Sequence, residues 1–208
     1  MSIPIAILGS GRGSNFDAIT RAGLDIQVVA VVSDQSDAPI LEKARQAGHP
    51  THCVEAAGLS RVDHERKILE VLSKAQPRFL VMAGYMRIVT ATLLEPFRSD
   101  RGYARVVNIH PSLLPSFPGV RAYEQAFRFG SKVAGVTVHL VDLDVDNGPI
   151  CAQESFDITD CRTAEEVEQR GLKVEHRLFP QTLKWVLPEA FTVSNADCAQ
   201  GRFHVRPN

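Results

Sequence analysis

The sequence predicts an α/β protein with a parallel sheet. Short runs rich in Val, Ile and Leu alternate with longer amphipathic stretches, as expected of strands buried on both faces and of the helices that cover them. The chain has 208 residues and a hydrophobic fraction of 44%, which is ample for a single well-packed core. We therefore expect one soluble globular domain.

The first half of the chain follows the order of repeated strand-helix-strand units. Strands are expected at Ile3–Leu8, Ile26–Val32, Thr51–Val54, Phe79–Ala83 and Arg105–Ile109, and helices at Asn15–Ala22, Pro39–Ala47, Arg61–Lys74 and Thr90–Pro96. The spacing of these segments suits a parallel sheet whose crossovers are helical.

The second half of the chain has a different order. A Pro-rich loop over residues 111–119 comes first, and its composition indicates a functional role. The elements expected after it are a helix at Ala122–Phe129, strands at Ala134–Val141 and Pro149–Phe156, and a long helix at Thr163–Val186. Turn residues at 195–197 between Phe191–Val193 and Phe203–Val205 predict a terminal hairpin. We assign residues 1–188 to the main domain and residues 189–208 to a hairpin extension of it.

Charge and composition restrict the partners. A formal net charge of -1 argues against nucleic-acid binding, which needs a basic face, so small metabolites are the expected partners. The apolar start of the chain lacks a basic n-region and reaches Gly9 at once, so we expect neither a signal peptide nor a membrane span, and a cytoplasmic protein. Because no Cys-x-x-Cys pair occurs, reduced thiols are expected at Cys53, Cys151, Cys161 and Cys198.

A glycine-rich loop, Gly9-Ser-Gly-Arg-Gly-Ser-Asn15, follows the first expected strand. Glycines permit a tight turn, Ser14 or Asn15 can cap the next helix, and the N–H groups of such a turn can bind an anion, with Arg12 adding charge. The loop is not a Walker loop, because no Lys follows its last Gly, and its glycine spacing differs from that of dinucleotide-binding proteins. Phosphate binding and a tight turn without a ligand both stay open.

Asn108 and His110 lie two residues apart where the fifth strand ends, so their side chains should point the same way. Ligands bind at this edge of a parallel sheet. An Asn amide can donate to a developing oxyanion, and a His can donate or shuttle a proton, which suits acyl transfer. Ser112 lacks the Gly-x-Ser-x-Gly elbow of serine hydrolases, which disfavours that class. A structural His is the alternative.

The acidic loop from Asp142 to Gly148 resembles part of a calcium-binding EF-hand loop. The distal Glu is missing and no incoming helix is predicted, so calcium is not expected. Instead, one carboxylate of this loop could face His110 and favour its protonated form. Thr137 and His139, two apart on a strand, could support that carboxylate. A solvated acidic loop is the alternative.

Taken together, these motifs resemble the signature of folate-dependent formyltransferases. The match consists of Asn108-Ile-His-Pro-Ser-Leu-Leu-Pro115, Phe117-Pro-Gly119 and Asp146-Asn-Gly-Pro-Ile150, and the similarity extends over nearly the whole chain. The most similar branch of the family formylates phosphoribosylglycinamide in purine synthesis.

Three further segments resemble binding segments of the family. Ala83-Gly-Tyr-Met-Arg-Ile88 is similar to the folate-pocket segment, Gly13-Ser-Asn15 to the loop that binds the substrate phosphate, and Glu175-His176 to a helix that contacts the ribonucleotide. The resemblance implies a three-layer, Rossmann-like fold with a mostly parallel seven-stranded sheet and helices on both faces. The N-terminal half would bind the ribonucleotide, and the C-terminal half would bind 10-formyltetrahydrofolate across a cleft.

The resemblance also implies a role for each matching residue. The catalytic residues are Asn108, His110 and Asp146. The substrate is bound by Gly13, Ser14, Asn15 and Glu175, and the folate by Arg61, Met86, Arg87, Ile88, Val89 and Asn108. The implied reaction is direct formyl transfer by a monomer or homodimer, without a metal, a covalent intermediate, a nucleic acid or a membrane.

One position departs from the family pattern. Relatives often carry Lys or Gln three residues before the Glu of the Glu-His pair, where this chain has Leu172 followed by Lys173. Neighbouring residues on a helix point about 100° apart, so Lys173 does not simply replace that contact. We expect Arg12, or as second choice Lys173, to supply the charge for the phosphate.

Three other functions compete with this interpretation. Methionyl-tRNA formyltransferase carries an additional C-terminal domain and a basic surface, which we do not expect here. Formyltetrahydrofolate deformylase, which uses water as the acceptor, adds an N-terminal domain, and its relatives usually have His-His-Ser where this chain has His110-Pro-Ser112. A non-catalytic folate-binding module is disfavoured because all three implied catalytic residues are present.

Overall fold

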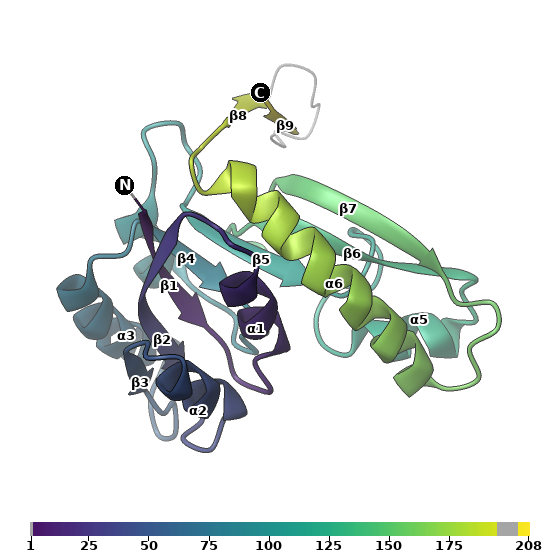
Figure 1. Cartoon of the computed structure of the whole chain (residues 1–208), viewed down its shortest axis with the longest axis horizontal. Helices are drawn as coiled ribbons and strands as arrows, with labels where there is room; N and C mark the ends of the chain where they lie inside the picture. Colours follow the sequence, from purple (N-terminus) through teal and green to yellow (C-terminus); the bar gives the residue numbers. More distant parts are fainter. Residues whose placement is uncertain (1, 195–203) are drawn as a thin grey trace. The chain divides into compact units, whose positions relative to one another are not determined.

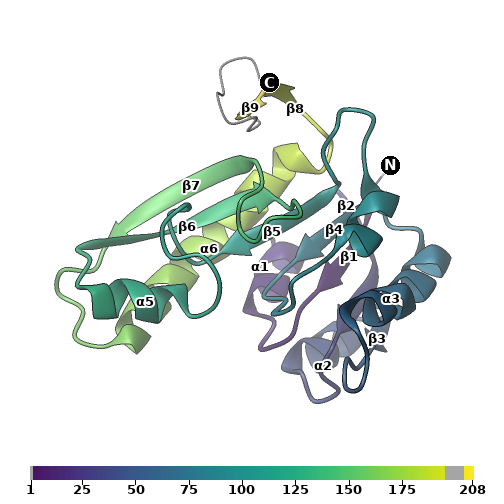
Figure 2. The ribbon, with the colours of Figure 1, turned by 180° about the vertical axis from the view of Figure 1, so that it is seen from behind.

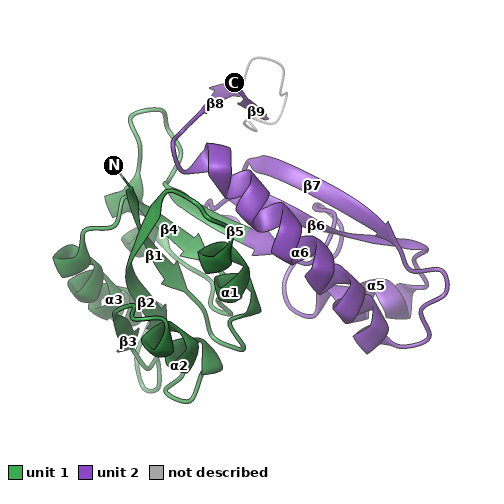
Figure 3. Ribbon diagram, in the orientation of Figure 1, with its two compact units in different colours: residues 1–108 green, residues 109–208 purple. Residues whose placement is uncertain are grey.

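A computed structural model describes residues 2–194 and 204–208 of the chain, which divides into two compact units, Met1–Asn108 and Ile109–Asn208 (Figures 1 and 3). Seven strands form one sheet in the order β3-β2-β1-β4-β5-β6-β7, and β8 and β9 form a second sheet. Strands β3, β2, β1, β4 and β5 pair parallel with their neighbours in this order, and β6 pairs with β7 antiparallel. The expected mostly parallel, seven-stranded sheet with a small terminal hairpin is therefore confirmed.

The first unit contains the strand-helix-strand repeats. Its elements are β1 (Ile3–Leu8), α1 (Ser14–Arg21), β2 (Ile26–Ser33), α2 (Pro39–Gln46), β3 (Thr51–Cys53), α3 (Arg61–Ala75), β4 (Phe79–Met82), α4 (Ala91–Leu94), the 3-10 helix η1 (Glu95–Phe97) and β5 (Val106–His110), which continues into the second unit. All four residues of β4 are buried, which is why this strand is a continuous apolar run. The carboxyl ends of the parallel strands β1, β4 and β5 meet at one edge, and the candidate binding loops follow them.

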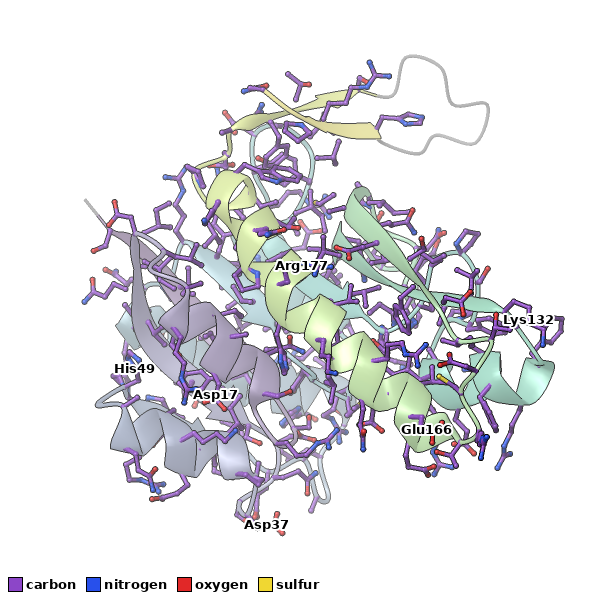
Figure 4. All side chains as sticks on the ribbon, turned by 45° about the vertical axis from the view of Figure 1, so that its right-hand side comes forward. Asp17, Asp37, His49, Lys132, Glu166 and Arg177 are labelled. Atoms are coloured by element: carbon purple, nitrogen blue, oxygen red, sulfur yellow. The ribbon has the colours of Figure 1, made fainter. Side chains whose placement is uncertain are left out.

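The second unit combines an antiparallel pair with a long helix. Its elements after β5 are α5 (Ala122–Phe129), β6 (Val133–Leu140), β7 (Ile150–Asp157), α6 (Ala164–Val186), β8 (Phe191–Ser194) and β9 (His204–Pro207). Helix α6 packs on β6, β7 and α5 (Figure 2). Figure 4 shows Arg177 and Glu166 along α6, and Arg177 forms an ion pair with Glu154 of β7. Helix α6 begins after Thr163, whose hydroxyl accepts from the backbone N–H of Glu166 at 3.2 Å.

Two local predictions differ from the structure, one at the start of a helix and one within a helix. The cap of α1 is Gly13, with φ 70° and no side-chain hydrogen bond, so neither Ser14 nor Asn15 caps this helix. The single helix expected over Thr90–Pro96 begins instead at Ala91 and becomes a 3-10 turn at Glu95. Pro96 contributes to the change, because it has no backbone N–H to donate to the carbonyl four residues before it.

Other expected elements are present within two residues of their predicted ends. The hairpin is formed by β8 and β9, which pair antiparallel, whereas its predicted turn at 195–197 and Phe203 lie outside the described residues. Among the residues that the structure describes, no helix is long and apolar enough to cross a membrane.

Candidate active site

The glycine loop joins β1 to α1 and packs closely on α2. A Cβ atom on Gly13 would lie 2.9 Å from the Cα of Ile40, and one on Gly9 would lie 2.6 Å from the Cδ1 of Ile40. The backbone N–H of Ile40 also donates to the carbonyl of Gly11 at 3.1 Å. Gly13 is therefore required by the close approach of the α2 backbone, whereas the contact at Gly9 is with the end of the Ile40 side chain. This packing needs no ligand.

The same geometry leaves the start of α1 suited to an anion. Ser14 and Asn15 are the first two residues of α1, and N–H groups in the first turn of a helix have no acceptor within the helix. A Cβ atom on Gly11 would meet no atom within 4 Å, so the loop has space beside its backbone. Arg12 is exposed in this loop. A negatively charged group would find both backbone donors and a cation here.

The segment after β4 is hydrogen-bonded to the glycine loop. The N–H of Ser10 donates to the carbonyl of Gly84 at 3.0 Å, and the N–H of Met86 donates to the Ser10 hydroxyl at 3.0 Å. Met86 and Ile88 are 70% and 46% exposed, while Val89 is buried. Two large apolar side chains exposed beside a binding loop suit an aromatic ring system.

The two arginines predicted to approach the folate have different surroundings. Arg87 is partly exposed, and its guanidinium Nη1 lies 3.6 Å from the buried Oδ2 of Asp34. Arg61 is exposed as the first residue of α3, directly after the capping Ser60. The ion pair with Asp34 fixes the direction of Arg87.

The second unit holds the histidine and the carboxylate together. The Nδ1 of His110 lies 3.4 Å from the Oδ2 of Asp146, and the two side chains are only 5% and 11% exposed. The Nε2 of His110 lies 3.0 Å from the carbonyl oxygen of Phe117. Both ring nitrogens thus face acceptors, an arrangement that suits an imidazolium, which has a hydrogen on each nitrogen. Asn108 lies two residues before His110 in β5 and is partly buried.

Backbone geometry holds Asp146 in place. Asp146 has φ 52°, in the left-handed region that Asp tolerates, and its Oδ2 accepts from the N–H of Gly119 at 2.7 Å. A Cβ atom on Gly148 would lie 1.9 Å from the carbonyl oxygen of Leu140, so this position requires glycine. The Asp-Asn-Gly sequence therefore turns the carboxylate toward the imidazole.

A second buried histidine lies on the other side of Asp146. The Nε2 of His139 lies 3.9 Å from the Asp146 Oδ1, and its Nδ1 lies 2.9 Å from the carbonyl oxygen of Leu140. Burial lowers the pKa of His139 below its ordinary value, against smaller opposing effects of the Leu140 carbonyl and Asp146. His139 is consequently neutral at neutral pH, with its hydrogen on Nδ1 toward Leu140.

Thr137 has a different role from the predicted one. Its hydroxyl donates to the carbonyl of Ser112 at 2.7 Å and accepts from the N–H of Leu114 at 3.1 Å. The amide of Gln153 donates to the Leu114 carbonyl and to the Thr137 hydroxyl, each at 2.9 Å. Thr137 thus fixes the Pro-rich loop and not the Asp146 carboxylate. Sequence reasoning missed Gln153, whose position on β7 opposite Thr137 depends on strand register.

On α6, Glu175 is buried and accepts a hydrogen bond from the Tyr123 hydroxyl at 2.7 Å. Leu172 is partly buried and Lys173 is exposed, so the two neighbours have different environments. Within residues 2–194 and 204–208, no group of three or more His, Cys, Asp or Glu side chains is arranged to hold a metal ion. Cys53, Cys151 and Cys161 are free thiols, and Cys198 lies outside the described residues.

Comparison with known proteins defines the class. The family model described as formyl transferase matches residues 3–183, and the chain therefore belongs to the formyl transferase family. The resemblance to folate-dependent formyltransferases is thereby confirmed.

The names of the most similar proteins specify the reaction more narrowly than the family description does. The chain is 39% identical to phosphoribosylglycinamide formyltransferase of Bacillus subtilis (strain 168), over 88% of this chain and 93% of that protein. It is 34% identical to the protein of the same name from Escherichia coli (strain K12), over 87% and 85% of the two chains. The solved structure of glycinamide ribonucleotide transformylase 1 from Symbiobacterium toebii superposes with a TM-score of 0.88 at 36% identity, over 99% of this chain and 94% of that one.

Proposed function

We propose that this enzyme transfers the formyl group of 10-formyltetrahydrofolate to the amine of phosphoribosylglycinamide, giving the N-formyl product and tetrahydrofolate in de novo purine synthesis. The observation that carries the proposal is the His110 ring, held between the Phe117 carbonyl and the Asp146 carboxylate two residues after Asn108. The near full-length similarity to proteins named for this reaction supports the choice of substrate.

The chemistry is a direct transfer in which the ribonucleotide amine attacks the formyl carbon. Asn108 donates a hydrogen bond to the formyl oxygen as negative charge develops there, and protonated His110 adds a second donor. These donors stabilise the transition state more than the ground state, since the oxygen carries its full charge only after attack. Neither a metal nor a covalent enzyme intermediate takes part.

Asp146 acts on the histidine and on the protons. Its carboxylate, oriented by the N–H of Gly119, favours the imidazolium of His110 through charge and through its own acceptor oxygen. Asp146 also helps to move the proton from the attacking amine to the leaving nitrogen, through water. The neutral His139 behind it adds no competing positive charge.

Substrate binding is divided among several segments. Gly13, Ser14 and Asn15 hold the phosphate through backbone donors, with Arg12 as the first candidate for the added charge and Lys173 as the second. Glu175 binds the ribonucleotide, and the folate is bound by Arg61, Met86, Arg87, Ile88, Val89 and Asn108. The exposed Met86 and Ile88 suit the apolar faces of a pterin ring. The enzyme acts on these small molecules in the cytoplasm as a monomer or homodimer, without a nucleic acid or a membrane, and residues 189–208 extend its main domain.

One assay separates this function from its competitors. The protein is incubated with 10-formyltetrahydrofolate alone and then with added phosphoribosylglycinamide, while the folate absorbance is followed. We expect turnover only after the ribonucleotide is added. Turnover with the folate alone would make the protein a deformylase, and no turnover in either arm would make it a binding module.

A further inference from the structure

Tyr123 of α5 and Glu175 of α6 form a buried pair that the proposed chemistry has not used. The Tyr123 hydroxyl donates to the Glu175 Oε1 at 2.7 Å, and the two residues are 7% and 6% exposed. A buried carboxylate is costly unless it is hydrogen-bonded, and a bond to a charged acceptor is stronger than a neutral one. This contact therefore constrains the position of the carboxylate.

Gly171 makes the contact possible. It lies one helical turn before Glu175, on the same face of α6. A Cβ atom on Gly171 would lie 2.2 Å from the Cζ and 2.3 Å from the hydroxyl oxygen of Tyr123, so any larger residue would displace the ring. Glycine inside a helix is less favourable than alanine, and its presence here is explained by the space that the tyrosine occupies.

The rest of the environment keeps Tyr123 a donor. Burial, and after it the negative charge of Glu175, raises the pKa of Tyr123 well above its ordinary value. The ring also contacts Phe156 edge-to-face at 6.1 Å between centroids, which fixes its plane. The hydroxyl is therefore protonated throughout the range in which enzymes are assayed, and it points at Glu175.

We propose that Tyr123 is a positioning residue that orients the Glu175 carboxylate for hydrogen bonds from the hydroxyl or amine hydrogens of the ribonucleotide. The inference rests on the proposed function, since it takes Glu175 as a substrate contact. Tyr123 itself touches Glu175 and not the substrate, and Gly171 provides the space for its ring. Misplacing a carboxylate acceptor weakens ribonucleotide binding without changing the groups that act on the formyl carbon.

The direct test is Tyr123→Phe, which removes the hydroxyl and keeps the ring. We expect the ribonucleotide KM to rise about tenfold, while kcat and the folate KM stay within about twofold. Tyr103→Phe is the matched control, because it removes another buried tyrosine hydroxyl in the other unit, and it should keep the parental constants. An active Tyr123→Phe variant with the parental ribonucleotide KM would overturn the inference.

A double-mutant cycle with Glu175→Gln separates positioning from packing. In the Glu175→Gln background, Tyr123→Phe should change the ribonucleotide KM by less than about twofold, because the charged acceptor is already gone. An equal rise in both backgrounds would mean that Tyr123 acts by packing and would overturn the inference. If wild-type enzyme transfers no formyl group to the ribonucleotide, the proposed function fails instead, and the inference fails with it.

A second variant applies if Tyr123→Phe does not fold. Gly171→Ala places a Cβ atom where the ring lies, so the hydroxyl moves away from Glu175 and the ribonucleotide KM should again rise about tenfold. Circular dichroism and the thermal midpoint report whether each variant is folded. A folded Gly171→Ala enzyme with the parental ribonucleotide KM would contradict the inference as directly as the first variant.

Discussion

The glycine loop of the first unit and the His110–Asp146 cluster of the second differ in what they present to a ligand. The loop presents backbone: Gly13 is set by contact with the backbone of Ile40 of α2, and the groups proposed to bind an anion are N–H groups that every residue except proline carries. The cluster presents side chains, and the mechanism proposed above depends on each one. A backbone site should therefore tolerate side-chain changes that a side-chain site does not.

The largest effect should come from Asn108→Ala. Loss of an oxyanion donor typically lowers kcat by about 10² or more, and the folate KM should stay within a few fold. Steady-state kinetics with each substrate varied in turn measure both quantities. A kcat close to that of the wild type would remove Asn108 from the chemistry and weaken the contrast between the two regions.

Asp146→Asn tests the charge of the cluster while keeping its shape. The amide oxygen of Asn can still accept from the N–H of Gly119, which in the wild type lies 2.7 Å from the Asp146 Oδ2, but it no longer favours a cation at His110. We expect kcat to fall by about tenfold or more, because His110 loses its charged partner. Steady-state kinetics decide the matter, because an unchanged kcat would make Asp146 only a loop residue.

The parts of both regions that sequence predicted are those with local causes. The strand that carries Asn108 and His110 follows from a buried apolar run, and the extent of α5, Ala122–Phe129, was predicted as observed. The residue that caps α1 was not predicted, because Gly13 is required there by contact with Ile40, which lies on another helix. Local capping preferences lose to tertiary contact there.

The Tyr123–Glu175 pair shows the same limit. Its partners are 52 residues apart in the chain, and no periodicity brings them together. One signal was present, since an isolated glycine inside a strongly helical segment often has a packing reason, and Gly171 is such a residue. That signal indicates a close approach to the helix but does not identify Tyr123 as the neighbour.

The backbone region is tested by removing its cation. Arg12→Ala should raise the ribonucleotide KM about tenfold, the effect of one charge-assisted contact of roughly 1.5 kcal/mol, with kcat and the folate KM unchanged. Arg21→Ala removes the same charge at the other end of α1 and serves as the control. Lys173→Ala and the double variant Arg12→Ala/Lys173→Ala identify the cation if Arg12 alone has no effect. If both single variants and the double variant keep the parental ribonucleotide KM, the backbone donors suffice to bind the phosphate. The glycine loop would then differ from the side-chain cluster even more than proposed.

The smallest effect is expected at His139. A substitution there tests whether burying this imidazole lowers the stability of the fold at low pH. Its pKa is lowered by burial below the ordinary value of 6.5, so below that pH the unfolded chain binds a proton that the folded chain does not. The folded state then loses stability as the pH falls from 6.5 toward the lowered pKa. His139→Asn keeps a donor for the Leu140 carbonyl, which lies 2.9 Å from the Nδ1 of His139, but cannot titrate. Urea unfolding between pH 7.5 and 5 should therefore show a smaller loss of stability for this variant than for the wild type. His204→Asn, an exposed exchange of the same kind, is the control. If the wild type and His139→Asn lose equal stability as the pH falls, the buried imidazole is not the cause of the pH dependence.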